Sequence, residues 1–75
     1  MKNDYLNWYL YKIIRNTEKE CRNFVQRSFV TVLEALEEGH YLAKAFGDGW
    51  KVELYEVRVS EKSELKQIYK ATIEY

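Results

Sequence analysis

The chain has 75 residues, and its twelve Lys and Arg residues balance twelve Asp and Glu residues, so the formal net charge is zero. This length suits one domain, which we expect to span residues 1–75, and leaves no room for a cofactor domain beside a substrate domain. A general nucleic-acid binder would be basic, so the charge balance argues against one. Hydrophobic residues make up 47% of the chain and aromatic residues 16%, which is too much apolar surface for a disordered segment.

Cysteine content and hydropathy bear on the cellular compartment. The single cysteine has no partner for an internal disulfide, which favours a reducing environment. The first residues lack the basic segment and the long apolar run of a signal peptide. No apolar stretch approaches the ~20 residues that a membrane-spanning helix needs. We therefore expect a cytoplasmic protein that does not contact the membrane.

Two helices are predicted in the first half of the chain. Residues 4–15 are rich in aromatic and β-branched residues, which would also suit a strand. Their apolar residues run consecutively instead of alternating, so we interpret the segment as a helix. A second helix is predicted over residues 18–38, where apolar residues recur at helical spacing. Thr17 and Glu20 have the spacing of a capping box at its start, and Gly39 is a natural stop at its end.

After this second helix the apolar residues recur with the two-residue period of strands. The pattern predicts three strands, over residues 40–46, 50–60 and 65–75. An antiparallel meander is the simplest arrangement of three consecutive strands. The predicted fold is therefore α+β, with two helices packed on a three-stranded antiparallel sheet.

Two local features are expected within these strands. Gly47-Asp48-Gly49 supplies the positive-φ residues of a tight hairpin between the first and second strands. In the second strand the apolar residues occupy every second position up to Leu54. From Tyr55 onwards they occupy the intervening positions, which would point to the other side of the strand. A β-bulge at this point would reconcile the two phases.

Candidate catalytic groups are few. Cys21, on the apolar stripe of a predicted helix, is expected to be a small core residue and not a nucleophile. His40, just beyond that helix, can complement the helix dipole. Glu34, Glu37, Glu38 and His40 lack the ligand pattern of a zinc or calcium site, so we interpret them as a solvated acidic patch. We predict no catalytic residue, no metal and no cofactor.

The aromatic residues point instead to a contact with another protein. On the first predicted helix, the side opposite the apolar one carries Trp8, Tyr11, Lys12 and Arg15. Trp, Tyr and Arg are the residues that dominate interface hot spots. We predict that these four residues bind a larger protein, as an inhibitor or regulator, and that the same surface can form a homodimer.

In size, aromatic content and lack of a catalytic set, the chain resembles small accessory proteins of phages and mobile elements, such as anti-defence inhibitors. The resemblance is one of type: it rests on no specific motif and assigns no residue. It implies a protein that works by occluding the surface of a host protein.

The alternative function is a small nucleic-acid-binding regulator. Lys12, Arg15, Lys19 and Arg22 recur at spacings of three, four and three residues. On one continuous helix they would form a basic stripe beside Trp8, a combination that contacts phosphates and stacks on bases. The break expected near Asn16 would scatter the stripe, so we favour protein binding over this alternative.

Overall fold

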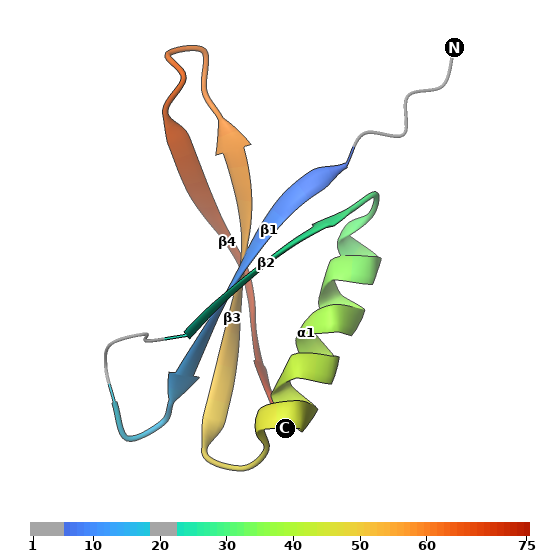
Figure 1. Cartoon of the computed structure of the whole chain (residues 1–75), viewed down its shortest axis with the longest axis vertical. Coiled ribbons are helices and arrows are strands. Elements are labelled where there is room, and N and C mark those ends of the chain that lie inside the picture. Colours follow the sequence, from blue (N-terminus) through green and yellow to red (C-terminus); the bar gives the residue numbers. More distant parts are fainter. Residues whose placement is uncertain (1–5, 19–22) are drawn as a thin grey trace.

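A computed structural model of the protein describes residues 6–18 and 23–75. These residues form β1 (Asn7–Arg15), β2 (Asn23–Phe29), α1 (Val32–Phe46), β3 (Trp50–Val59) and β4 (Leu65–Glu74). The strands form one sheet in the order β2-β1-β3-β4, with antiparallel pairing throughout. The sheet is strongly twisted, and the end of the β3–β4 hairpin projects away from α1 (Figure 1). The expected combination of an antiparallel sheet with helix is confirmed, whereas the two-helix, three-strand arrangement is wrong.

The helix predicted over residues 4–15 is instead the strand β1. This strand lies inside the sheet, paired with β2 on one side and β3 on the other. Tyr9 and Tyr11 are buried on one face, and Leu10 and Ile14 are buried on the opposite face. A strand buried on both faces has consecutive apolar residues. The failed alternation that suggested a helix therefore came from a central strand.

The helix predicted over residues 18–38 is also wrong. Residues 23–29 form the strand β2, and α1 begins only at Val32. The capping box is formed by Thr31 and Glu34: the Glu34 backbone N–H donates to the Thr31 hydroxyl, and the Thr31 backbone N–H donates to the Glu34 carboxylate, each at 3.3 Å. Thr17 lies outside any helix, and Glu20 lies outside the described residues. The chain contains two segments with capping-box spacing, and the second one starts the helix.

The strand predicted over residues 40–46 is the second half of α1, which runs through Gly39 without stopping. Gly39 is buried where the helix passes over β4, and a Cβ there would overlap the side chain of Ile73. Close packing of the Ile73 side chain against the helix backbone thus explains a glycine inside a helix.

The glycines after the helix have the positive φ that the sequence suggested, but they join a helix to a strand and not two strands. Gly47 has φ 86° and ends α1, with its backbone N–H donating to the Ala43 carbonyl at 2.8 Å. Gly49 has φ 90° and leads into β3.

The strands predicted over residues 50–60 and 65–75 are confirmed as β3 and β4. Their pairing register shifts between Leu54 and Tyr55, where the bulge was predicted. Leu54 pairs with Ala71 but Tyr55 pairs with Tyr69, so the extra residue is Lys70 of β4. β3 keeps its alternation, and its Tyr55 points to the same side of the sheet as Tyr69.

The core lies between α1 and one face of the sheet. The Tyr11 side chain is fully buried there, and its hydroxyl donates to the Ala35 carbonyl of α1 at 2.7 Å. The core comprises Tyr9, Tyr11, Ile13, Ala35, Leu42, Ala43, Val52, Leu54 and Ile73. Every strand residue in this set points towards α1. The helix therefore covers one face of the sheet, and no described element covers the other face.

The start of α1 can be tested with a matched pair of substitutions. Thr31→Ala removes the capping hydroxyl and should lower the free energy of unfolding by ~1 kcal/mol. Thr17→Ala, at the segment that sequence reasoning had chosen, should leave it within ~0.5 kcal/mol of the wild-type value. Urea unfolding followed by circular dichroism measures both. Equal losses for the two variants would contradict the assigned helix start.

Candidate interaction surface on the open face of the sheet

No described element covers the face of the sheet that points away from α1, here named the open face. Its residues follow from the strand register, because directly paired residues project to the same side. The open face consists of Trp8, Leu10, Lys12, Ile14, Phe24, Gln26, Ser28, Lys51, Glu53, Tyr55, Val57, Val59, Leu65, Gln67, Tyr69, Thr72 and Glu74. It draws on all four strands.

The register arranges these side chains in rows across the sheet. From the projecting β3–β4 end, the rows are Val59 and Leu65; Ser28, Trp8, Val57 and Gln67; Gln26, Leu10, Tyr55 and Tyr69; Phe24, Lys12, Glu53 and Thr72; and Ile14, Lys51 and Glu74. Aliphatic and aromatic side chains dominate the first three rows, whereas all the charged side chains lie in the last two. The open face therefore has an apolar end and a charged end.

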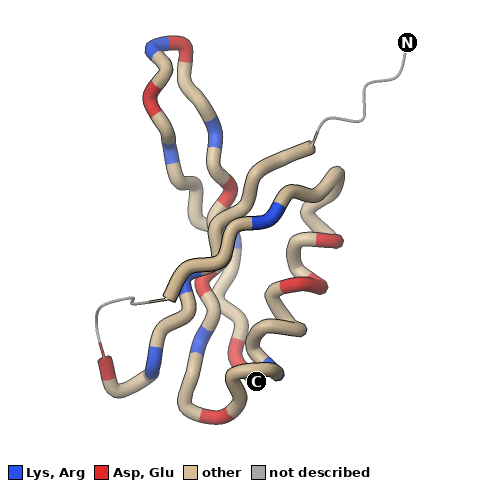
Figure 2. Tube along the Cα trace, viewed as in Figure 1, with Lys and Arg blue, Asp and Glu red and all other residues tan. Residues whose placement is uncertain are grey.

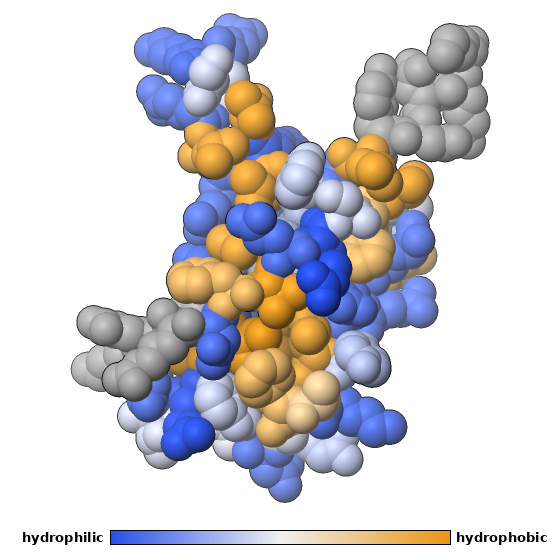
Figure 3. All heavy atoms as spheres, viewed as in Figure 1, coloured by the Kyte–Doolittle hydropathy of each residue, from blue (hydrophilic) through white to orange (hydrophobic). Residues whose placement is uncertain are grey.

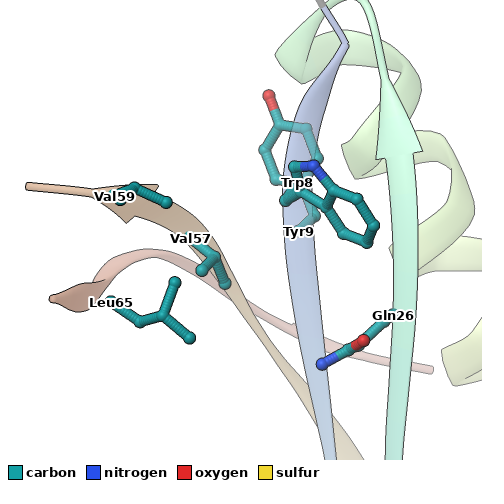
Figure 4. A pocket seen from close by; sticks show the side chains of 6 residues that line it. All are labelled: Trp8, Tyr9, Gln26, Val57, Val59 and Leu65. Atoms are coloured by element: carbon teal, nitrogen blue, oxygen red, sulfur yellow. The ribbon is translucent and has the colours of Figure 1, made fainter. Parts of the chain in front are cut away.

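A hollow of about 260 Å³ lies at the apolar end. Figure 4 shows Trp8 and Gln26 on one side of it, and Val57, Val59 and Leu65 of the β3–β4 hairpin on the other. Trp8 is 58% exposed and Leu65 is 72% exposed. Apolar side chains are visible at the surface near this hairpin and across the middle of the molecule (Figure 3). Exposed apolar surface around a hollow is typical of interaction sites.

The charges of the open face are largely neutralised within the face. The Lys12 ammonium lies 4.3 Å from the centre of the Tyr55 ring. Lys51 is 3.9 Å from the carboxylate of Glu53, which also accepts a hydrogen bond from the Tyr55 hydroxyl at 2.9 Å. Lys12 and Lys51 balance Glu53 and Glu74, so the face has no net charge. Figure 2 shows both signs of charge along β3 and β4, with acidic positions on α1.

The four residues predicted to bind a partner do not share one surface. Trp8 and Lys12 lie on the open face, but Tyr11 is fully buried under α1, where burial raises the pKa of its hydroxyl. Arg15 also points to the helix side, with its guanidinium 4.8 Å from the centre of the Trp50 ring. Alternation along a strand separates residues that one helix face would have brought together. Tyr11 thus has a core role and cannot reach a partner.

The two described residues of the candidate basic stripe lie on a strand and not on a helix. Lys12 and Arg15 project from opposite faces of β1, because they are three residues apart on a strand. Lys19 and Arg22 lie outside the described residues. The continuous helix that would have aligned the four basic residues does not exist over residues 7–15.

Sequence reasoning missed most of the open face. The phase change predicted at Tyr55 would turn Tyr55, Val57 and Val59 towards the core, yet they face away from α1. The signal was present in the alternation of this strand: Leu54 and Glu56, which flank Tyr55, both face α1 and are buried. Leu65 and Tyr69 join the open face because the bulge reverses the phase of β4.

Two of the other candidate groups, Glu34 and Glu38, have structural roles. Glu34 caps α1, and Glu38 is 3.4 Å from Arg27 of β2. His40 is exposed on α1, and Cys21 lies outside the described residues. Among residues 6–18 and 23–75, no group of three or more His, Cys, Asp or Glu side chains could hold a metal ion.

Glu56 is a buried residue on the helix side of the sheet, and two basic neighbours stabilise the ionised form of its carboxylate. Glu56 accepts from the Arg58 guanidinium at 2.6 Å and lies 3.2 Å from the Lys70 ammonium. The hydrogen bond from Arg58, aided by that from Lys70, outweighs desolvation and holds the pKa of Glu56 below its usual 4.5. Lys70 is the extra residue of the β4 bulge. Its ion pair with Glu56 therefore lies where the alternation of side chains along β4 changes sides of the sheet.

Comparison with known proteins gives no family for the chain: no protein-family model matches it, and neither curated proteins nor solved structures show a significant match. Within the described residues, no helix has the length and apolar character needed to cross a membrane.

The Glu56 ion pair predicts a specific pH dependence of stability. A carboxylate with a lowered pKa in the folded state stabilises the fold above its unfolded pKa, and that contribution is lost as the pH falls through the folded pKa. Between about pH 6 and about pH 2, the wild type should lose more of its unfolding free energy than Glu56→Gln does. Urea unfolding at a series of pH values measures this. The control Glu61→Gln, at the exposed hairpin turn, should follow the wild type, and parallel profiles for wild type and Glu56→Gln would contradict the role of Glu56.

Proposed function

We propose that this chain is a small non-enzymatic protein-binding module that inhibits or regulates a larger protein by occluding part of its surface. The observation that carries the proposal is the hollow at the apolar end of the open face, with the exposed Trp8 beside it. Interface hot spots are enriched in Trp and Tyr and sit in pockets from which water can be excluded. Trp8, Tyr55 and Tyr69 supply such residues on one face.

The charge of the open face supports a protein over a nucleic acid as the ligand. Binding to a phosphate backbone depends on a surplus of Lys and Arg side chains that displace counterions. Lys12 and Lys51 are offset by Glu53 and Glu74 on the same face. An apolar, uncharged centre is the usual composition of a protein interface. The alternative of a nucleic-acid-binding regulator gains no support from the placement of Lys12 and Arg15.

The biological setting belongs to the same proposal. Small size and high aromatic content favour an accessory protein of the phage or mobile-element type, directed against a host protein. A single cysteine favours action in the cytoplasm, where thiols stay reduced.

Capture from the native cell, with the bound proteins quantified by mass spectrometry, tests the proposal. Trp8→Glu and Leu65→Glu place a charge at the hollow and should reduce recovery of the specific partner by at least ~10-fold. Leu33→Glu is the matched control: Leu33 is 68% exposed but lies on α1, so recovery should not change. Circular dichroism confirms that each variant is folded. Recovery that is the same for all four proteins would contradict binding through the open face.

A further inference from the structure

We propose that the open face also binds a second copy of this chain, so that two sheets pack face to face in a homodimer. This inference rests on that part of the proposed function which makes the open face a protein-binding surface. Two packed sheets lie about 10 Å apart with their strands within about 30° of each other. The dimer would therefore consist of two central sheets with α1 of each copy on the outside.

Symmetry limits how two identical faces can meet. A homodimer has a two-fold axis, and for two facing sheets that axis lies in the plane between them. We place the axis parallel to the strands and between β1 and β3, the two central strands of the sheet. Each row of the open face then meets the same row of the other copy, with β1 facing β3 and β2 facing β4.

In this arrangement the open face is complementary to itself. Trp8 faces Val57 of the partner subunit and Leu10 faces the partner's Tyr55, because each of these pairs shares a row on β1 and β3. Lys12 faces the partner's Glu53 by the same rule. In these central rows apolar side chains meet apolar ones and Lys12 meets a carboxylate, while in the last row Lys51 faces the partner's Ile14.

The other possible axis, across the strands, gives a poor match. It reverses the order of the rows, so that Val57 would face the partner's Glu53 and the row of Val59 and Leu65 would face the row of Lys51 and Glu74. Carboxylates and ammonium groups would then be desolvated against aliphatic side chains, which is costly. The axis parallel to the strands pairs Lys12 with Glu53 and sets only Lys51, at the end of the face, against an aliphatic side chain of the described strands, so the distribution of charge favours this axis.

The size of the face suits a modest dimer. Four strands spaced ~4.8 Å apart and about nine residues long cover roughly 19 by 30 Å, or ~570 Å² per copy before side-chain relief is counted. Stable interfaces bury ~600–1,000 Å² per partner, so this flat-area estimate lies just below the lower limit of that range. We expect it to dissociate at micromolar concentrations, where a foreign protein could compete for the same face.

A charge-swap mixing experiment tests this dimer. Lys12→Glu gives a face with acidic residues at positions 12 and 53. Glu53→Lys gives a face with basic residues at the same two positions. Each variant alone should stay at the 9.1 kDa of one chain by light scattering up to ~500 µM, while the wild type should approach twice that mass. An equimolar mixture of the two variants should form the dimer again, because each acidic face then meets a basic one.

Additional variants keep the test decisive if a charge swap disturbs folding. Leu65→Glu changes a side chain that is 72% exposed and should abolish the dimer, whereas Leu33→Glu on α1 should dimerise as the wild type does. A wild type that stays monomeric, a mixture that fails to associate, or a Leu65→Glu protein that dimerises normally would each overturn the inference.

The outcomes separate this inference from the proposed function. A monomeric wild type that still captures a foreign protein through Trp8 would overturn the dimer and leave the proposed function standing. A dimer that responds to the variants as expected, in a chain that captures no other protein through Trp8, would support the dimer and contradict the proposed function.

Discussion

The burial of β1 on both of its faces is the constraint on which the rest of the structure depends. On one face, α1 covers the strand, with the hydrogen bond from Tyr11 to Ala35 joining helix and sheet. On the other face, Leu10 and Ile14 are also buried, although no described element packs across that face. A helix of 15 residues packed on one side cannot cover both faces. The open face follows directly from this imbalance.

The details of β3 and β4 turn this uncovered face into a shaped surface. The bulge at Lys70 brings Tyr69 beside Tyr55 on the open face, with their ring centres 5.8 Å apart. The projecting hairpin holds Val59 and Leu65 at the edge of the hollow beside Trp8 (Figure 4). At the opposite end, Lys and Glu side chains neutralise one another. The result is a face with an apolar end and no net charge, whose recognition depends on shape and short-range contact.

The sequence predicted the parts of the fold that have clear local signals. β3 and β4 were predicted because alternation and turn residues mark them. The register shift lies at the predicted position, but the extra residue is in β4 and the phase change expected in β3 does not occur. The helix boundaries were wrong because two segments have capping-box spacing and Gly39 suits both a helix end and a close helix–sheet contact. Trp8 and Lys12 were found as surface residues, but Tyr11 was misplaced, since helical and strand periods assign different neighbours to a face. The open face itself requires knowledge of strand order, which no local pattern supplies.

The two tryptophan indole N–H signals in a ¹H–¹⁵N NMR dilution series test most directly whether the open face is the binding surface. Trp8 lies on that face, while Trp50 packs against Phe46 on the helix side, with ring centres 5.1 Å apart. We expect the Trp8 signal to shift as protein or partner concentration rises and the Trp50 signal to stay unchanged. Association accompanied by a shift of Trp50 and a constant Trp8 signal would contradict binding through the open face.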